Sequence, residues 1–267
     1  MSEQKIAILD FYKGTENDEV GQLLDLAKET LPGTQFDVFD VRSSMEFPDL
    51  SYAAFLVSGG PGDPRDPEGL FAEMFGQWLD GVLTYNKNHD VKRPVLLICH
   101  SFQMACLHWK LADITRRKSP TFGVYSVHLT DHGVKDPLLG QLENPFFAAD
   151  FRSFQVVSPR EDAMDELGAS LLALEKVRPH VPLERAVMAM RFSPHILGVQ
   201  FHPEVPPADM RKALKDPKRR EAFIQANGQD KYAKMLKYLN DTSKMYDVYQ
   251  KLIPAFLTGI QEPAVVS

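Results

Sequence analysis

The sequence has little cysteine, no long apolar run and no excess of positive charge. Its two cysteines, Cys99 and Cys106, lie seven positions apart on one expected helical segment. That is too far along the axis for a comfortable disulfide, and such sparse usage is typical of a reducing compartment. No apolar run approaches the length needed to cross a bilayer. The formal net charge of -6 argues against a general nucleic-acid surface. We therefore expect a soluble protein that binds neither membranes nor nucleic acid.

Motifs typical of cofactor or metal binding are also missing. The sequence has no GxxxxGK phosphate loop, no dinucleotide fingerprint after a strand and no cysteine-rich cluster. His128, Asp131 and His132 are better explained as a polar turn between strands than as a metal site. We expect neither a metal nor a cofactor. The first five residues lead directly into the apolar run IAIL, which leaves no room for an export leader, so we expect a cytoplasmic protein.

The first half of the chain alternates strands and helices. With 44% hydrophobic and 25% charged residues, the 267-residue chain has the composition of an ordinary globular protein. Periodicity predicts strands over 5–11, 35–41, 53–57 and 94–98, and helices over 19–30, 68–85 and 102–111. A β-α-β start of this kind normally makes a right-handed crossover between parallel strands.

The second half carries strands in quick succession, and the regular alternation weakens. We expect strands over 122–129, 146–157, 170–177, 186–192 and 196–201. Strands of this kind commonly extend an open sheet antiparallel at one edge. The predicted fold is therefore α/β, an open and mostly parallel sheet flanked by helices, with antiparallel edge strands.

After residue 205 the strand signal ends. Helical stretches follow over 210–214, 219–226, 232–239 and 245–257, and they carry many lysines and arginines. We predict a catalytic domain over 1–205 and a C-terminal helical extension over 206–267 that packs on the same domain. We expect the extension to lie beside the sheet edge or the mouth of the site and to bear on the choice of partner or substrate.

Cys99 lies where an apolar strand meets an amphipathic helix, in RPVLLICHSFQMACLHWKL. The backbone N–H groups and the positive end of the helix dipole then point at its sulfur, which favours thiolate. A small core residue is the commonest role of a free cysteine. This stretch alone leaves the two interpretations level.

Two further features follow strands. In SGGPGDP, residues 58–64, Gly59, Gly60 and Gly62 can take unusual backbone angles and present bare N–H groups to an oxyanion, although a tight turn explains the loop as well. In GVQFHPE, residues 198–204, a fixed proline lets Glu204 orient His202 as a base toward a thiol. Ligands of open α/β sheets bind at the carboxyl ends of strands, so the three features together favour a nucleophile.

These motifs resemble those of the class I, triad-type glutamine amidotransferases, over roughly residues 5–205. The chain is most similar to a stand-alone amidotransferase domain of the GMP-synthase type. SGGPGDP is similar to the family's oxyanion loop, ICHSFQ to its nucleophile elbow and VQFHPE to its histidine-glutamate motif. The resemblance implies a flavodoxin-like fold and a catalytic triad. The implied residues are the nucleophile Cys99, the general base and acid His202, the orienting Glu204, the oxyanion-hole N–H groups of Gly60 and His100, and the substrate contacts Gly62, Gln103, Ser153 and Phe154.

Three residues depart from the family pattern. Leu97 and Ser101 stand where the family usually has glycine, and His100 stands where it usually has an apolar residue. These departures bear on the identity of the substrate more than on the nucleophile.

The implied reaction releases ammonia from glutamine, or from a related γ-glutamyl amide, through a γ-glutamyl thioester on Cys99. The substrate is a small molecule, and a separate synthetase subunit would accept the ammonia, because the chain shows no synthetase domain of its own. A γ-glutamyl peptidase that accepts a larger leaving group is an alternative. A non-catalytic binding or regulatory module on the same fold is an alternative of another class.

Overall fold

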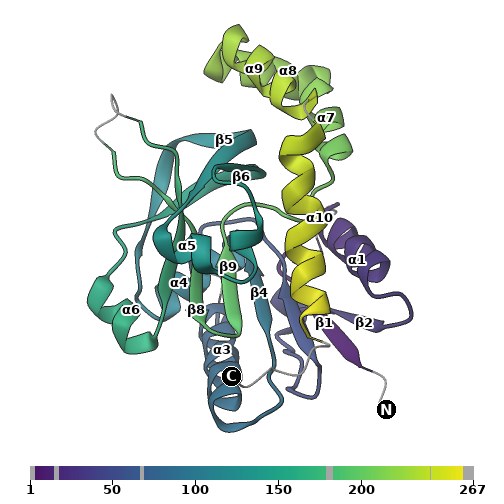
Figure 1. The fold of residues 1–267 in the computed structure, drawn as a ribbon, viewed down its shortest axis with the longest axis vertical. Coiled ribbons are helices and arrows are strands. Elements are labelled where there is room, and N and C mark those ends of the chain that lie inside the picture. The colour runs from purple at the N-terminus through teal and green to yellow at the C-terminus, as the bar shows by residue number, and fades with distance from the viewer. Residues whose placement is uncertain (1–3, 15–17, 67–68, 179–182, 241, 261–267) are drawn as a thin grey trace.

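The computed structural model describes residues 4–14, 18–66, 69–178, 183–240 and 242–260 (Figure 1). The strands are β1 (Lys5–Asp10), β2 (Gln35–Asp40), β3 (Ala54–Val57), β4 (Val95–Ile98), β5 (Asp113–Leu129), β6 (Phe146–Val157), β7 (Ser170–Glu175), β8 (Val187–Ser193) and β9 (Ile196–Val199). The helices are α1 (Glu19–Thr30), α2 (Val41–Ser44), α3 (Phe71–Asn88), α4 (His100–His108), α5 (Asp131–Lys135), η1 (Leu139–Gln141), α6 (Glu161–Leu167), α7 (Pro207–Lys215), α8 (Pro217–Asn227), α9 (Gln229–Asn240) and α10 (Thr242–Thr258).

Most predicted elements lie within a few residues of their expected bounds, and three differences stand out. β5 begins at Asp113 rather than at residue 122. The prediction missed its first half because those residues are mostly polar and carry no strand signal. The helices α2, α5 and α6 were not expected. α3 was expected from residue 68, which lies outside the described residues, and it starts at Phe71.

Five strands form the parallel half of the sheet, in the order β2-β1-β3-β4-β9. Strands β3 and β4 are buried throughout, as their apolar runs AFLV and VLLI require. Alternate residues face separate cores. Ile8 packs in a core with Leu23 of α1 and Leu252 of α10, while Leu9 packs in the opposite core with Phe75 of α3. The carboxyl ends of the parallel strands therefore meet at one edge between two helical layers.

The predicted antiparallel strands of the second half are present, but the prediction of an open, mostly parallel sheet was wrong. β8 pairs antiparallel with β9, and β6, β5 and β7 continue antiparallel, with β7 pairing again with β8. These four strands, β5 to β8, close on themselves as a small barrel. The long β5–β6 pair has an irregularity between Arg116 and Thr121, and a bulge of this kind bends a strand pair as closure requires. The tight turn at Pro194 and His195 joins the barrel strand β8 to β9 of the parallel half.

The C-terminal helices form two parts. α7, α8 and α9 share an apolar cluster with β5 and β6, built around residues such as Val124, Met210, Phe223 and Met235. α10 then runs back beside α1 along the parallel half (Figure 1). The boundary between domain and extension at residue 205 stays a prediction. No helix in the described part of the chain is long and apolar enough to cross a membrane.

Candidate active site

Cys99 occupies a strained turn between β4 and α4. Its φ of 52° and ψ of -99° are unusual for a residue with a side chain, and such strain persists only where the surroundings impose it. The Cys99 N–H donates to the carbonyl of Val199 on the neighbouring strand at 2.8 Å. Cys99 therefore stands at the carboxyl end of the parallel half, directly before the N-terminus of a helix.

Two of the three departures from the family pattern, Ser101 and Leu97, have structural explanations. Ser101 Oγ accepts a hydrogen bond from the N–H of Ile98 at 2.9 Å and lies 3.2 Å from the carbonyl of Val57, so it ties the elbow to β3. Leu97 pairs across the sheet with Gly198. A Cβ added at Gly198 would overlap the ring of Phe102, so the close helix–strand approach is made at Gly198.

His202 and Glu204 form a buried pair. His202 Nδ1 lies 2.7 Å from Glu204 Oε1, and the His202 N–H donates to the carbonyl of Ala149 at 2.9 Å. The imidazole also stacks on Phe151, with ring centroids 4.2 Å apart. Burial alone would lower the pKa of His202, but the Glu204 carboxylate and the sulfur of Cys99 raise it well above 6.5. The geometry thus favours a charged imidazolium.

The glycine loop brings this pair and the cysteine together. A Cβ added at Gly59 would lie 3.1 Å from His202 Cε1, 3.5 Å from Cys99 Cβ and 3.2 Å from Tyr12 Oη. Loop, cysteine and histidine therefore touch at one point, where only glycine fits without displacing a neighbour. These groups are far apart in the sequence, and the sheet joins them.

Arg42 holds the glycine loop in place, a contact that the sequence analysis did not predict. Arg42 is buried, and its Nη1 donates to the carbonyls of Pro61 at 2.6 Å and Phe11 at 3.2 Å. Gly60 lies against the same segment, since an added Cβ would be 2.8 Å from the Phe11 carbonyl oxygen. Gly62 has a φ of 103°, a conformation that favours glycine. No motif points to Arg42, because its role depends on packing alone.

His100 is the first residue of α4, so its N–H has no acceptor within the helix. Its side chain is buried, and burial together with the nearby charge of Arg42 lowers the pKa of His100 to about 4. The imidazole is therefore neutral near pH 7, and the position presents a free backbone donor beside Cys99 without adding charge.

Three of the expected substrate contacts, Gln103, Ser153 and Phe154, lie on α4 and β6. Gln103 Nε2 donates to the carbonyl of Phe154 at 3.2 Å and to Gln200 Oε1 at 2.9 Å. Gln200 Nε2 in turn lies 3.5 Å from Cys99 Sγ. Ser153 is half-buried beside Phe154 on β6. Gln200 is a site residue that we did not predict, although it stands inside the GVQFHPE motif.

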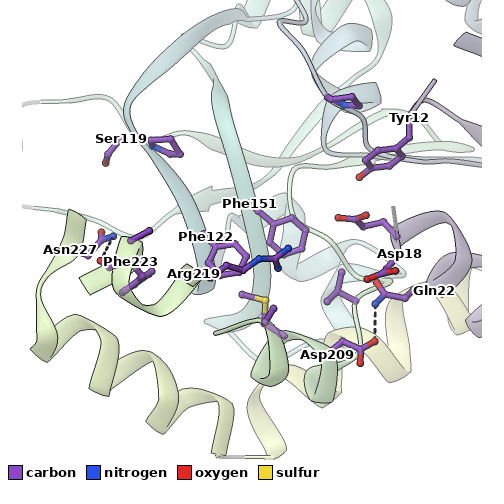
Figure 2. Close-up of a pocket in the computed structure, with 17 residues that line it drawn as sticks. Tyr12, Asp18, Gln22, Ser119, Phe122, Phe151, Asp209, Arg219, Phe223 and Asn227 are labelled. Carbon is purple, nitrogen blue, oxygen red and sulfur yellow. Dashed lines mark hydrogen bonds between the residues drawn. The ribbon is translucent and has the colours of Figure 1, made fainter. Parts of the chain in front are cut away.

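A cavity of about 1060 Å³ opens between Tyr12 and Phe151 on one side and the helices α7 and α8 on the other (Figure 2). Its wall includes Tyr12, Pro61 and Phe151, which belong to the surroundings of Cys99 and His202, and residues of α7 and α8. Among the described residues, no group of three or more His, Cys, Asp or Glu side chains could hold a metal ion.

The family model of the class-I glutamine amidotransferases matches residues 8–217, and the chain belongs to this family. The chain's strained cysteine, glycine loop and His–Glu pair all fall inside the matched residues. No curated protein matches the chain.

Solved structures share the fold at low sequence identity. A glutamine amidotransferase of Thermotoga maritima has 17% identity and a TM-score of 0.66, and the match covers 98% of this chain and 100% of the other. A GMP synthase subunit protein of Thermoplasma acidophilum has 16% identity, a TM-score of 0.56 and coverage of 98% and 97%. The glutaminase domain of Trypanosoma brucei CTP synthase, with bound acivicin, has 16% identity, a TM-score of 0.54 and coverage of 93% and 94%.

Proposed function

We propose that the protein hydrolyses the γ-amide of glutamine, or of a related γ-glutamyl compound, with Cys99 as nucleophile. The observation that carries the proposal is the contact of three groups at one point: the strained Cys99, the His202–Glu204 pair and the glycine loop. Each group is ordinary alone. A cysteine beside a charged imidazole that is itself oriented by a carboxylate is the arrangement of an activated thiol.

The reaction then runs in two steps. The Cys99 thiolate attacks the γ-carbonyl carbon, the S–C bond forms, and the C–N bond breaks as His202 gives its proton to the departing nitrogen. Water next adds to the γ-glutamyl thioester as the neutral His202 accepts its proton, the S–C bond breaks, and glutamate leaves with the Cys99 thiolate restored. The backbone N–H groups of Gly60 and His100 stabilise the oxyanion in both steps.

Gly62, Gln103, Ser153 and Phe154 are the proposed contacts to the glutamyl part of the substrate. The hydrogen bonds of Gln103 to Phe154 and Gln200 support this assignment, because they place its side chain between β6 and the cysteine. Gln200, which donates toward the Cys99 sulfur, is proposed to help position the thiolate.

The test uses Cys99→Ala with Cys106→Ala as its matched control. Cys106 is buried in the same helical segment, and burial raises the pKa of its thiol, so it should be inert. Cys99→Ala should fold, lose hydrolysis by about 10⁴-fold or more, and lose covalent labelling by a glutamine-like electrophile such as acivicin. Cys106→Ala should keep both. Labelling of Cys106, or unchanged turnover in Cys99→Ala, would refute the assignment.

A synthetase that accepts the ammonia is a second part of the proposal. The similar proteins include a GMP synthase subunit protein and a CTP synthase glutaminase domain, which supports a partner of this type. Co-purification with a synthetase, and stimulation of turnover by it, would bear this out. Full turnover by the isolated chain would instead favour a stand-alone hydrolase and would dispose of the non-catalytic alternative.

A further inference from the structure

One end of the cavity is formed by residues that surround the proposed triad. Phe151, whose ring stacks on His202, forms part of its wall, and so does Pro61 from the glycine loop. Tyr12, the third residue at this end, contacts the same point as Cys99 and His202. Figure 2 shows Phe151 and Tyr12 facing the space between them and the helices below. A molecule in this cavity would therefore lie against Phe151 and Tyr12, the side chains that contact His202 and the glycine loop.

The far wall comes from the helical extension. Met210 and Ala213 on α7, and Ala222 and Phe223 on α8, line it. The family model ends at residue 217, where α8 begins, so most of this second helix lies beyond the part that the chain shares with the family model. The wall thus combines α7, which lies inside the residues matched by the family model, with α8, most of which lies beyond them.

The position of His202 indicates which part of a substrate would occupy the cavity. The imidazole protonates the departing nitrogen, so the substituent on that nitrogen must leave past His202 and the Phe151 ring. The proposed glutamyl contacts, Gln103 and Phe154, are not among the described residues that line the cavity. Phe151, which stacks on His202, does line the cavity, so the cavity lies on the side of His202, where the leaving group would depart.

The side chains that line the cavity determine which leaving groups it can bind. Its apolar part is aromatic and aliphatic, with Phe122, Phe151 and Phe223 among the rings. Three carboxylates, Asp18, Glu19 and Asp209, stand at one end. Arg219 is the only basic side chain among the described lining residues, and its guanidinium lies 5.6 Å from the Phe122 ring centroid. With three carboxylates and one guanidinium, the lining disfavours a negatively charged substituent on the departing nitrogen.

We propose that this cavity binds the amine portion of γ-glutamyl amides whose amine carries a bulky aromatic or aliphatic body and no negative charge. The volume, about 1060 Å³, is far larger than ammonia requires and suits a drug-sized group. The proposal rests on the proposed function and adds its substrate class. It assigns the extension the role of selecting the leaving group.

Four substrates test it: glutamine, γ-glutamyl ethylamide, γ-glutamyl 2-phenylethylamide and γ-glutamyl-phenylalanine. The last two differ only by a carboxylate. We expect kcat/KM for the phenylethylamide to exceed that for the ethylamide by about 10-fold or more, and to exceed that for γ-glutamyl-phenylalanine by a similar factor. An equal or better ethylamide would overturn the cavity's role, and a preferred phenylalanine compound would overturn its charge preference.

Two blocking variants give an independent readout. Ala213→Trp on α7 and Ala222→Trp on α8 fill the cavity and should lower kcat/KM for the phenylethylamide about 10-fold while leaving glutamine turnover unchanged. Ala208→Trp is the control, because Ala208 lies on α7 but does not line this cavity. It should change neither substrate.

Acivicin labelling of Cys99 separates the two possible failures. If Cys99 is labelled and glutamine is hydrolysed, but neither the substrate series nor the blocking variants show a preference, the cavity proposal is wrong and the proposed function stands. If Cys99 is not labelled and no γ-glutamyl compound is hydrolysed, the proposed function is wrong and this proposal falls with it.

Discussion

The parallel half of the sheet and the small barrel are built on different physics. The strands of the parallel half are packed between two apolar cores, and they hold the cysteine and the glycine loop at their carboxyl ends. The barrel instead holds buried charges. Arg152 lies 3.1 Å from Asp150 and 2.7 Å from Glu175, and Arg117 lies 2.9 Å from the same glutamate.

The parallel half and the barrel therefore serve different purposes. Apolar packing makes a rigid frame on which a strained residue such as Cys99 can be held. The barrel, with β5 and β6 joined to the extension, supplies Phe151 against His202 and one wall of the cavity. In the proposed function, the first region carries the nucleophile and the glycine loop, whereas the proposed leaving-group cavity takes part of its wall from the second.

The largest expected effect comes from the pair that joins the two regions. Glu204→Gln keeps a hydrogen-bond acceptor for His202 but removes the charge that raises its pKa. We expect kcat/KM to fall by about 10²–10⁴-fold, and the alkaline limb of the pH–rate profile to move to lower pH. An unchanged limb would show that His202 does not depend on this carboxylate.

The same variant has a pH-dependent stability. Because the folded-state pKa of His202 lies above its unfolded value, its protonation stabilises the fold fully below about pH 6.5, and this contribution is lost as pH rises through the folded pKa. Urea unfolding should therefore show the largest deficit of Glu204→Gln at pH 6.5 and below, and a smaller one at higher pH.

The barrel's buried charges give the next effect. Arg152→Met leaves Asp150 buried without its nearest cation and should cost about 3–5 kcal/mol in the free energy of unfolding. Arg178→Met is the matched control, since Arg178 pairs with Glu175 at 2.9 Å but is 39% exposed. It should cost less than about 1 kcal/mol. Equal losses would mean that the barrel does not depend on buried ion pairs.

His100 offers an effect confined to acid. Burial and Arg42 hold the pKa of His100 at about 4, below the unfolded value near 6.5, so the wild type loses stability as pH falls from about 6.5 to 4. This loss is on the order of 3 kcal/mol. His100→Gln should remove it and keep activity at pH 7, because only the backbone N–H is proposed to act. The exposed His132→Gln should not change the acid profile.

The smallest effect tests the elbow. Ser101→Gly restores the residue usual in the family and removes the hydrogen bonds of the hydroxyl with Ile98 and Val57. We expect a loss of about 1–2 kcal/mol in stability with hydrolysis retained. A large loss of kcat would instead give Ser101 a part in the reaction.

Local patterns made much of this protein predictable. The strand before Cys99 and helix α1 were placed from their periodicity, because buried strands and amphipathic helices repeat over neighbouring residues. The candidate triad and loop were recognised from short motifs. The sheet's second half was not predictable in the same way, because strand direction and closure depend on partners distant in the sequence.

By itself the sequence determined the residues of the candidate reaction centre and the family, since a strand–turn–helix with cysteine, a glycine loop and a His-Pro-Glu run are local requirements of backbone and spacing. Only the tertiary structure decided how Arg42 holds the loop, how Gln200 reaches Cys99 and how α8 lines a cavity beside His202. These contacts join segments far apart in the chain, and burial and packing, rather than any repeating pattern, bring them together.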